Sequence, residues 1–119
     1  MTMSTNNEKL TTISKEPNIV TLINDVTVEP ENQQRLVELF AEMTENIMCK
    51  QPGFISSNIH KSLDGEKVVI YAQWRSEEDF RAVFKRPEVL SQLPERAVFS
   101  KLVKSETVVL YEVSYINHF

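Results

Sequence analysis

Glycine is scarce in this chain: it has 2 among 119 residues, Gly53 and Gly65. Phosphate-binding loops of the P-loop and dinucleotide kinds need several glycines within a short stretch. We therefore exclude a nucleotide or FAD bound by such a loop, while flavin mononucleotide held in another way stays open. Cysteine is scarcer still. The single Cys49 can form no internal disulfide, which favours a reducing compartment.

Positive charge is also in short supply: 13 Lys and Arg stand against 17 Asp and Glu, for a net charge of −4. Because nucleic-acid affinity depends on clustered Lys and Arg, this balance argues against a nucleic-acid partner. No apolar run approaches the ~20 residues that span a membrane, and residues 1–17 lack the basic and apolar regions of a secretory signal. We expect a cytoplasmic protein with residues 1–16 as a disordered or loosely attached tail and residues 17–119 as one domain.

Metal-ligating residues are few and unfavourably spaced. Neither His60 nor His118 has a Cys, Asp or Glu at the spacing of a metal site, so we expect no bound metal. His60 is either a proton carrier or an exposed or interface residue. Cys49 is expected at a helix C-terminus, where the helix dipole disfavours a thiolate, so we do not expect a nucleophile there.

Turn and cap residues divide the middle of the chain. Pro52-Gly53 cannot continue a helix. Asp64-Gly65 lies between two strand-like runs and fits a two-residue type I′ turn, in which both central residues need positive φ. Ser76, with Asp79 three residues on, predicts a helix start. The only tryptophan, Trp74, therefore lies where a strand ends and a helix begins, a common place for the wall of a pocket.

Hydrophobic periodicity predicts the remaining elements. In order they are a strand over 19–28, a helix over 31–50, a hairpin over 54–63 and 67–74, a helix over 76–85, one or two short helical turns over 88–103, and a strand over 107–116. The order βαββαβ with right-handed crossovers gives an α+β fold of the ferredoxin-like kind. We expect a four-stranded antiparallel sheet with both helices on one face.

The last strand is apolar on both faces. One face carries Val109, Tyr111, Val113 and Tyr115, and the other carries Val108, Leu110 and Ile116. A sheet covered by helices on one side needs only one apolar face. We therefore expect a second subunit on the open face, in a homodimer whose sheets pack together.

Two residues of the sheet are candidates for chemistry. Trp74 shares a face with Ile70 and small Ala72, which leaves room beside the indole for a flat ligand; the alternative is that Trp74 only fills the core. Asn24 interrupts an otherwise apolar strand face, and a buried amide needs a partner. That partner is either a neighbouring backbone group or water, or it is a ligand carbonyl or developing oxyanion.

At these residues the chain resembles the antibiotic biosynthesis monooxygenase (ABM) family, over residues 19–116. The matching segments are Leu22-Ile23-Asn24, Val26-Thr27-Val28, Pro52-Gly53-Phe54, Asp64-Gly65, and Tyr71-Ala72-Gln73-Trp74 with Ser76. The resemblance implies a dimeric α+β barrel. The best-understood members oxygenate tricyclic anthrones to anthraquinones without metal, haem or flavin. Their substrate loses a proton, the resulting carbanion reduces O2, and a peroxide collapses to the quinone.

For this chain the resemblance implies a cofactor-independent monooxygenase that acts with O2 on a small hydrophobic aromatic, polyketide or quinol-like substrate. Asn24 and Trp74 fall at the family's functional positions and are the catalytic candidates. The side chains expected to line the substrate pocket are Ile70, Ala72, Phe80, Phe84, Phe40 and Met43.

The chain departs from the family pattern at two positions. Ile70 stands where that branch has a second Asn, and Phe80 stands where some members have a Tyr, so two polar contacts to a quinone oxygen are missing. The haem-degrading branch has an iron-ligating His near the position of Phe84, and the second helix here contains no His, which argues against haem degradation. The alternative function is a non-catalytic dimeric module that binds small molecules or serves in a stress response. A filled interior would favour it, and the fold alone cannot choose.

Overall fold

The computed structural model describes residues 10–119. Its strands are β1 (Val20–Val28), β2 (Phe54–Lys61), β3 (Lys67–Trp74) and β4 (Val103–Tyr111). Its helices are α1 (Gln33–Asn46), α2 (Glu77–Val83), α3 (Pro87–Leu90) and α4 (Arg96–Leu102), and 3₁₀ turns at Pro30–Asn32 and Met48–Lys50 flank α1. None of the described helices is long and apolar enough to cross a membrane.

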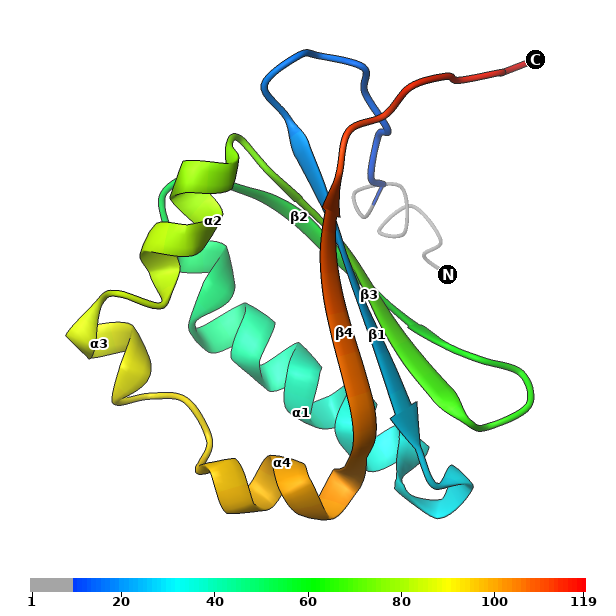
Figure 1. Ribbon diagram of the computed structural model, residues 1–119, viewed down its shortest axis with the longest axis vertical. Helices are drawn as coiled ribbons and strands as arrows, with labels where there is room; N and C mark the ends of the chain where they lie inside the picture. The colour runs from blue at the N-terminus through cyan, green and yellow to red at the C-terminus, as the bar shows by residue number, and fades with distance from the viewer. Residues whose placement is uncertain (1–9) are drawn as a thin grey trace, which may run out of the picture.

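The strands form one antiparallel sheet in the order β2-β3-β1-β4. The helices gather on one face of this sheet, with α1 lying across it and α2, α3 and α4 following one another along the rim (Figure 1). This arrangement confirms the ferredoxin-like α+β fold predicted from the element order.

The hydrophobic core is divided into two clusters of buried side chains. One lies where the end of α2 and α3 meet the sheet and consists of Leu22, Ile47, Ala72, Trp74, Val83 and Val89. The other lies under α1 and consists of Val26, Val28, Leu36, Leu39, Phe40 and Val68. Ile70, paired with Asn24 across β1 and β3, is only partly buried and packs against both clusters. The row of the sheet that carries Asn24 and Ile70 therefore marks the boundary between them.

The turn of the β2–β3 hairpin differs from the predicted type I′ turn. Only Gly65 has a positive φ, of 84°, and Asp64 does not. The Gly65 N–H donates to the Ser62 carbonyl at 3.2 Å, and the Ser62 N–H donates to the Lys67 carbonyl at 3.0 Å. Four residues, 63–66, thus form the loop, and only its third residue needs the left-handed conformation that glycine supplies.

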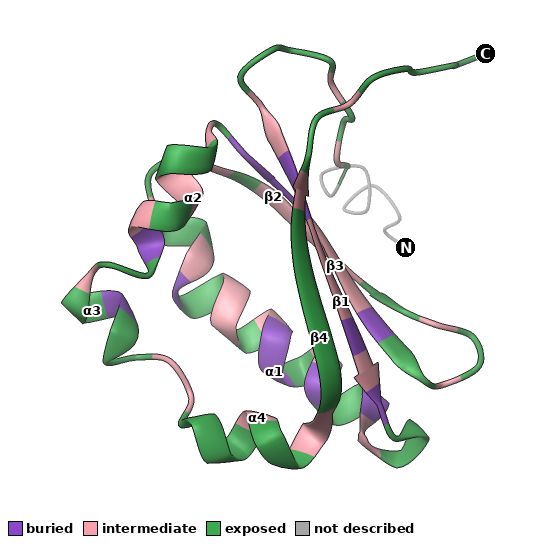
Figure 2. Ribbon diagram, in the orientation of Figure 1, coloured by how far each residue is buried: buried purple, intermediate pink, exposed green. Residues whose placement is uncertain are grey.

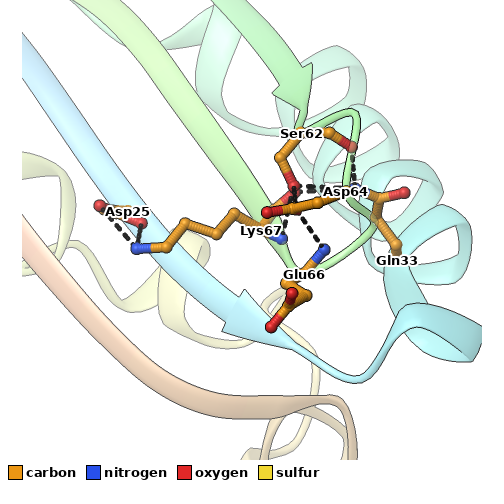
Figure 3. A network of polar contacts seen from close by, with 6 residues as sticks. All are labelled: Asp25, Gln33, Ser62, Asp64, Glu66 and Lys67. Atoms are coloured by element: carbon orange, nitrogen blue, oxygen red, sulfur yellow. Dashed lines mark hydrogen bonds and ion pairs between the residues drawn. The ribbon is translucent and has the colours of Figure 1, made fainter.

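A network of polar contacts ties this hairpin end to the first turn of α1 (Figure 3). The Gln33 side chain is buried, and its Nε2 donates to the carbonyls of Ser62 at 3.0 Å and Lys67 at 2.9 Å. The Asp64 carboxylate accepts from the Ser62 hydroxyl and the Glu66 N–H, and these bonds hold the loop closed. The buried amide therefore holds α1 against the sheet.

The bounds predicted for the last strand, 107–116, are wrong at both ends, because β4 runs from Val103 to Tyr111. Tyr111 pairs with Thr21, next to the first residue of β1. After Tyr111 the apolar alternation continues in the sequence, but β1 offers no further residue for backbone hydrogen bonds, so the strand ends there. At its other end β4 starts with Val103, and the four polar residues that follow it, 104–107, show no apolar alternation. Most of β4 is exposed (Figure 2).

The chain before β1 lies partly on the open face of the sheet. Thr11 Oγ1 donates to Asn58 Oδ1 at 3.0 Å, and Gln73 Nε2 donates to the Thr12 carbonyl at 2.9 Å. Gln73 is 2% exposed as a result. A disordered or loosely attached tail is expected over 1–16; residues 1–9 lie outside the described residues, and the part that the structure describes is attached by these bonds.

Candidate active site

A cavity of about 630 Å³ lies between the sheet, α1 and the segment from α2 to α4. This is the size range of pockets that hold drug-sized ligands. All eight residues predicted for the site line it: Asn24, Trp74, Ile70, Ala72, Phe80, Phe84, Phe40 and Met43. The cavity runs from the Trp74 end of the sheet, past the gap between the two core clusters, to β4. The hollow beneath the helices is thus present and is not filled by side chains.

Asn24 lies at the middle of the cavity floor. Its neighbours in the sheet are Ile70 on β3 and Val108 on β4, both apolar. Its Oδ1 is buried and has no hydrogen-bond partner among residues 10–119. The first alternative for Asn24, a backbone partner, is therefore not observed for this atom, and the amide is available to a ligand.

Trp74 closes one end of the cavity and also packs in the core. It is 3% exposed and lies between Phe54, in an edge-on contact with ring centroids 5.5 Å apart, and Phe80, at 5.8 Å. Phe84 continues the row, 5.6 Å from Phe80. Phe84 is 42% exposed, so this end of the cavity is reached from solvent past its ring. Both interpretations of Trp74, core residue and pocket wall, apply at once.

The segment around Gly53 and Ser76 fixes the position of Trp74. The Arg75 N–H donates to the Gly53 carbonyl at 2.8 Å, which joins the strand end to the loop before β2. The Ser76 hydroxyl accepts from the Asp79 N–H at 3.0 Å, the N-cap bond predicted from the sequence. Gly53 has a φ of +87°, and a Cβ there would lie 2.5 Å from Asp79. A rigid junction therefore presents the indole.

Two charged side chains of the lining were missed by the sequence reasoning, Arg96 on α4 and Glu106 on β4. Thr44, Ser57 and Ser100 add hydroxyl groups. The signal for Glu106 was present, because counting back in steps of two from Leu110 and Val108 reaches it on the same face. No sequence signal places Arg96, since its position depends on how the α3–α4 segment folds over the sheet.

The remaining reactive side chains lie away from the cavity. His60 is exposed on β2, and Cys49 is a free, exposed thiol after α1. Within residues 10–119 no group of three or more His, Cys, Asp or Glu side chains could hold a metal ion.

Fold and cavity together define the class of this protein: a small ferredoxin-like α+β domain with an aromatic-lined small-molecule site beneath its helices. A sequence model of the family described as antibiotic biosynthesis monooxygenase matches residues 19–91. The chain belongs to the antibiotic biosynthesis monooxygenase family, as the resemblance predicted.

Individual relatives agree with this assignment. Tetracenomycin-F1 monooxygenase of Streptomyces glaucescens is 46% identical over 80 residues, which are 67% of this chain and 71% of that protein. The structure of SnoaB, a cofactor-independent oxygenase from Streptomyces nogalater, superposes with a TM-score of 0.66 at 22% identity, covering 83% of this chain and 96% of that one. An anthrone oxidase-like protein superposes with a TM-score of 0.71 at 27% identity, over 84% of this chain and 41% of that one.

Proposed function

We propose that this protein is a cofactor-independent monooxygenase that oxidises a flat, hydroxylated polycyclic ketone with O2. One observation carries the proposal. The cavity is lined mainly by apolar and aromatic side chains, and the buried amide oxygen of Asn24 in its floor has no partner among the described residues. A buried acceptor without a donor is costly to keep, and a ligand hydroxyl that donates to this oxygen would satisfy it.

The chemistry asked of the protein is modest. A methylene conjugated through the ring system with a ketone loses a proton and becomes an enolate-like carbanion. The carbanion reduces O2 and forms a carbon–oxygen bond, and the hydroperoxide then loses water, so that one methylene and one O2 become one carbonyl and one water. The protein has to hold the ring system, keep water out and stabilise the negative charge on the ketone oxygen. The Asn24 Nδ2 is the donor for the last of these tasks, while its Oδ1 is an acceptor and would take a hydrogen bond from a ligand hydroxyl. Trp74, Phe80 and Phe84 are the aromatic side chains of the lining that would hold the rings.

The two apolar replacements, Ile70 and Phe80, shape the expected substrate. Both side chains line the cavity, so neither Ile70 beside Asn24 nor Phe80 beside Trp74 adds an amide or hydroxyl. Binding at this end must rest on ring stacking and apolar contact. We therefore propose a substrate whose polar groups are concentrated near Asn24 and toward β4, with an apolar ring at the Trp74 end. The name of the Streptomyces glaucescens relative, tetracenomycin-F1 monooxygenase, makes tetracenomycin F1 a candidate substrate to test.

Oxygen consumption tests the proposal directly. The purified protein should consume O2 with 1,8-dihydroxyanthrone or tetracenomycin F1, in equal amounts to the quinone formed. Asn24→Ala should lower kcat by about 10²-fold, the usual cost of removing one oxyanion donor. Trp74→Phe should also reduce turnover while circular dichroism shows the fold intact.

Two results would overturn the proposal. One is no O2 uptake above the buffer rate across a panel of anthrones, naphthacenones and quinols. The other is tight binding of these compounds without turnover, which would support the non-catalytic binding module instead. The open cavity favours the enzyme, because the filled interior that would favour the module is not observed.

We also propose a homodimer formed through the open face of the sheet. Val109 and Tyr111 on that face of β4 are 45% and 48% exposed. The bound segment around Thr11 and Thr12 covers only the β2–β3 side, so the β4 side is left for a partner. A monomer in sedimentation velocity at micromolar concentration would refute this.

The free, exposed Cys49 suits a reducing compartment, and we place the protein in the cytoplasm.

A further inference from the structure

Glu106 and Arg96 are the charged side chains among the residues that line the cavity. Arg96 begins α4, and Glu106 belongs to β4. A carboxylate at the edge of an apolar cavity that binds a carbon acid is chemically notable, because the reaction begins with removal of a proton. Among the described residues that line the cavity, no side chain other than Glu106 carries a carboxylate.

The sheet register places Glu106 close to Asn24. Across β1 and β4, Asn24 pairs with Val108 and Val26 pairs with Glu106. Glu106 is therefore the diagonal neighbour of Asn24 on the face that carries the cavity. Side chains in this relation are about 7–8 Å apart at the backbone and within reach of long residues. The amide and the carboxylate thus stand side by side without touching, one on each of two adjacent strands.

We propose that Glu106 is the general base that takes the proton from the substrate methylene, a role that rests on the oxygenase function proposed above. In an anthrone-type ring the ketone and the methylene lie on opposite sides of the central ring. Two separate groups must therefore serve them, and the diagonal placement of Asn24 and Glu106 supplies the two.

The proton and electron balance is closed by the same carboxylate. The methylene C–H bond breaks, its proton goes to Glu106, and the electron pair is delocalised onto the ketone oxygen, to which the Asn24 Nδ2 would donate. The carbanion transfers its electrons to O2 and binds it, and the protonated Glu106 returns a proton to the peroxide. Glu106, again a carboxylate, takes the second methylene proton as the O–O bond breaks, and that proton and the leaving hydroxide together form the water that is released beside the new carbonyl.

The charged surroundings of Glu106 leave its carboxylate available. Arg96 on α4 is the charged group that faces the cavity with it. Lys104 on its own strand is paired with Glu29 at 3.2 Å. The cavity-lining residues of α1 and β1 carry no charge: Phe40, Met43, Thr44, Leu22 and Asn24. Glu106 itself is exposed on the edge strand.

The experiment compares Glu106→Gln with the wild-type protein, using 1,8-dihydroxyanthrone and O2. A general base contributes about 10²–10⁴-fold, so kcat at neutral pH should fall by at least about 10²-fold while KM changes little. The difference should narrow as pH rises, because an anthrone that ionises in solution no longer needs the base. Deuterium at the methylene should slow Glu106→Gln more than the wild type. Glu45→Gln, an exposed change on α1 away from the cavity, is the matched control and should behave as wild type.

The outcomes separate this inference from the proposed function. If the wild type shows no O2 uptake with any substrate of the panel, the function itself fails and Glu106 has no proton to take. If the wild type is active and Glu106→Gln keeps more than half of its kcat with the same pH profile, the base is not Glu106. A uniform loss at all pH values with a raised KM would assign Glu106 to binding and would also refute the base. A thermal unfolding midpoint within a few degrees of wild type confirms that the variant is folded.

Discussion

Replacing Asn24 by leucine separates the effect of this residue on the stability of the unliganded protein from its effect on turnover. The Asn24 Oδ1 is buried without a partner among residues 10–119, and the side chains beside it, Ile70 and Val108, are apolar. Leucine has the same number and branching of side-chain heavy atoms, and the open cavity beside Asn24 gives room for its larger methyl groups. The unliganded protein should therefore become more stable, while turnover should be lost with the amide.

The expected size follows from the unpaired atom. A buried polar group without a hydrogen bond costs about 1–3 kcal/mol, and the added apolar surface contributes in the same direction. We expect Asn24→Leu to raise the free energy of unfolding by about 1–2 kcal/mol. For a domain of this size, each kcal/mol raises the unfolding midpoint by about 4 °C. Urea and thermal unfolding measure the gain, and O2 uptake measures the loss, which should reach about 10²-fold.

Asn58 on β2 provides the matched control, because its amide is paired. Its Oδ1 accepts from Thr11 Oγ1 at 3.0 Å, and its Nδ2 donates to the Tyr71 carbonyl at 3.3 Å. Asn58→Leu should destabilise by about 1–2 kcal/mol and leave turnover near wild type. Should Asn24→Leu instead destabilise as much as Asn58→Leu, Asn24 has a structural partner, and the argument that its amide awaits a ligand is wrong.

Three further changes test the parts that hold the cavity in shape. Gly53→Ala should destabilise by about 1–3 kcal/mol in chemical unfolding, because the φ of +87° is strained for alanine and its Cβ would meet Asp79 at 2.5 Å; an unchanged midpoint would contradict this. Gln33→Leu should cost a similar amount, about 1–3 kcal/mol, since two hairpin carbonyls lose a donor, whereas Gln34→Leu, exposed one residue on, should not. The Glu66 N–H and then the Ser62 hydroxyl hold the pKa of Asp64 below its usual 3.8. Their stabilisation is therefore complete above that pH and is lost as pH falls below it, so the stability gap between wild type and Asp64→Asn should close in an acid titration.

Much of the fold could be predicted because local signals and tertiary structure agree. Pro52-Gly53 ends a helical segment, the Ser76 cap starts another, and alternation marks β1 and β3. The errors occur where a local sequence pattern favours a structure that the neighbouring strand does not continue. The apolar alternation continues past Tyr111, but β1 has no residue left to pair with it. Asp64-Gly65 fits a two-residue turn, yet the strands part at Lys61 and rejoin at Lys67, so a longer loop forms with one left-handed residue.

The site residues on the central strands could be predicted from the sequence, but those contributed by the α3–α4 segment could not. Asn24 was visible because one polar residue in an apolar strand face needs an explanation. Trp74 was visible because it stands at a strand-to-helix junction. Glu106 could have been found by extending the alternation of Leu110 and Val108 toward the start of the strand, whereas Arg96 could not, since the segment that carries it has little periodicity and its faces are set by how it packs on the sheet. The division of the core into two clusters could not be predicted either, because it depends on how the helices pack on the sheet.

That boundary has a practical consequence for finding the natural ligand. A planar molecule lodged at the Asn24–Ile70 row would touch both clusters and complete an interior that the chain alone leaves in two parts. Binding to the folded state raises the apparent stability by RT ln(1 + [L]/Kd), about 2.7 kcal/mol at a concentration of 100 Kd. A melting-temperature screen of purified polyketides at equal concentration, run under nitrogen so that no turnover occurs, would therefore rank compounds by their affinity for the space between the two clusters.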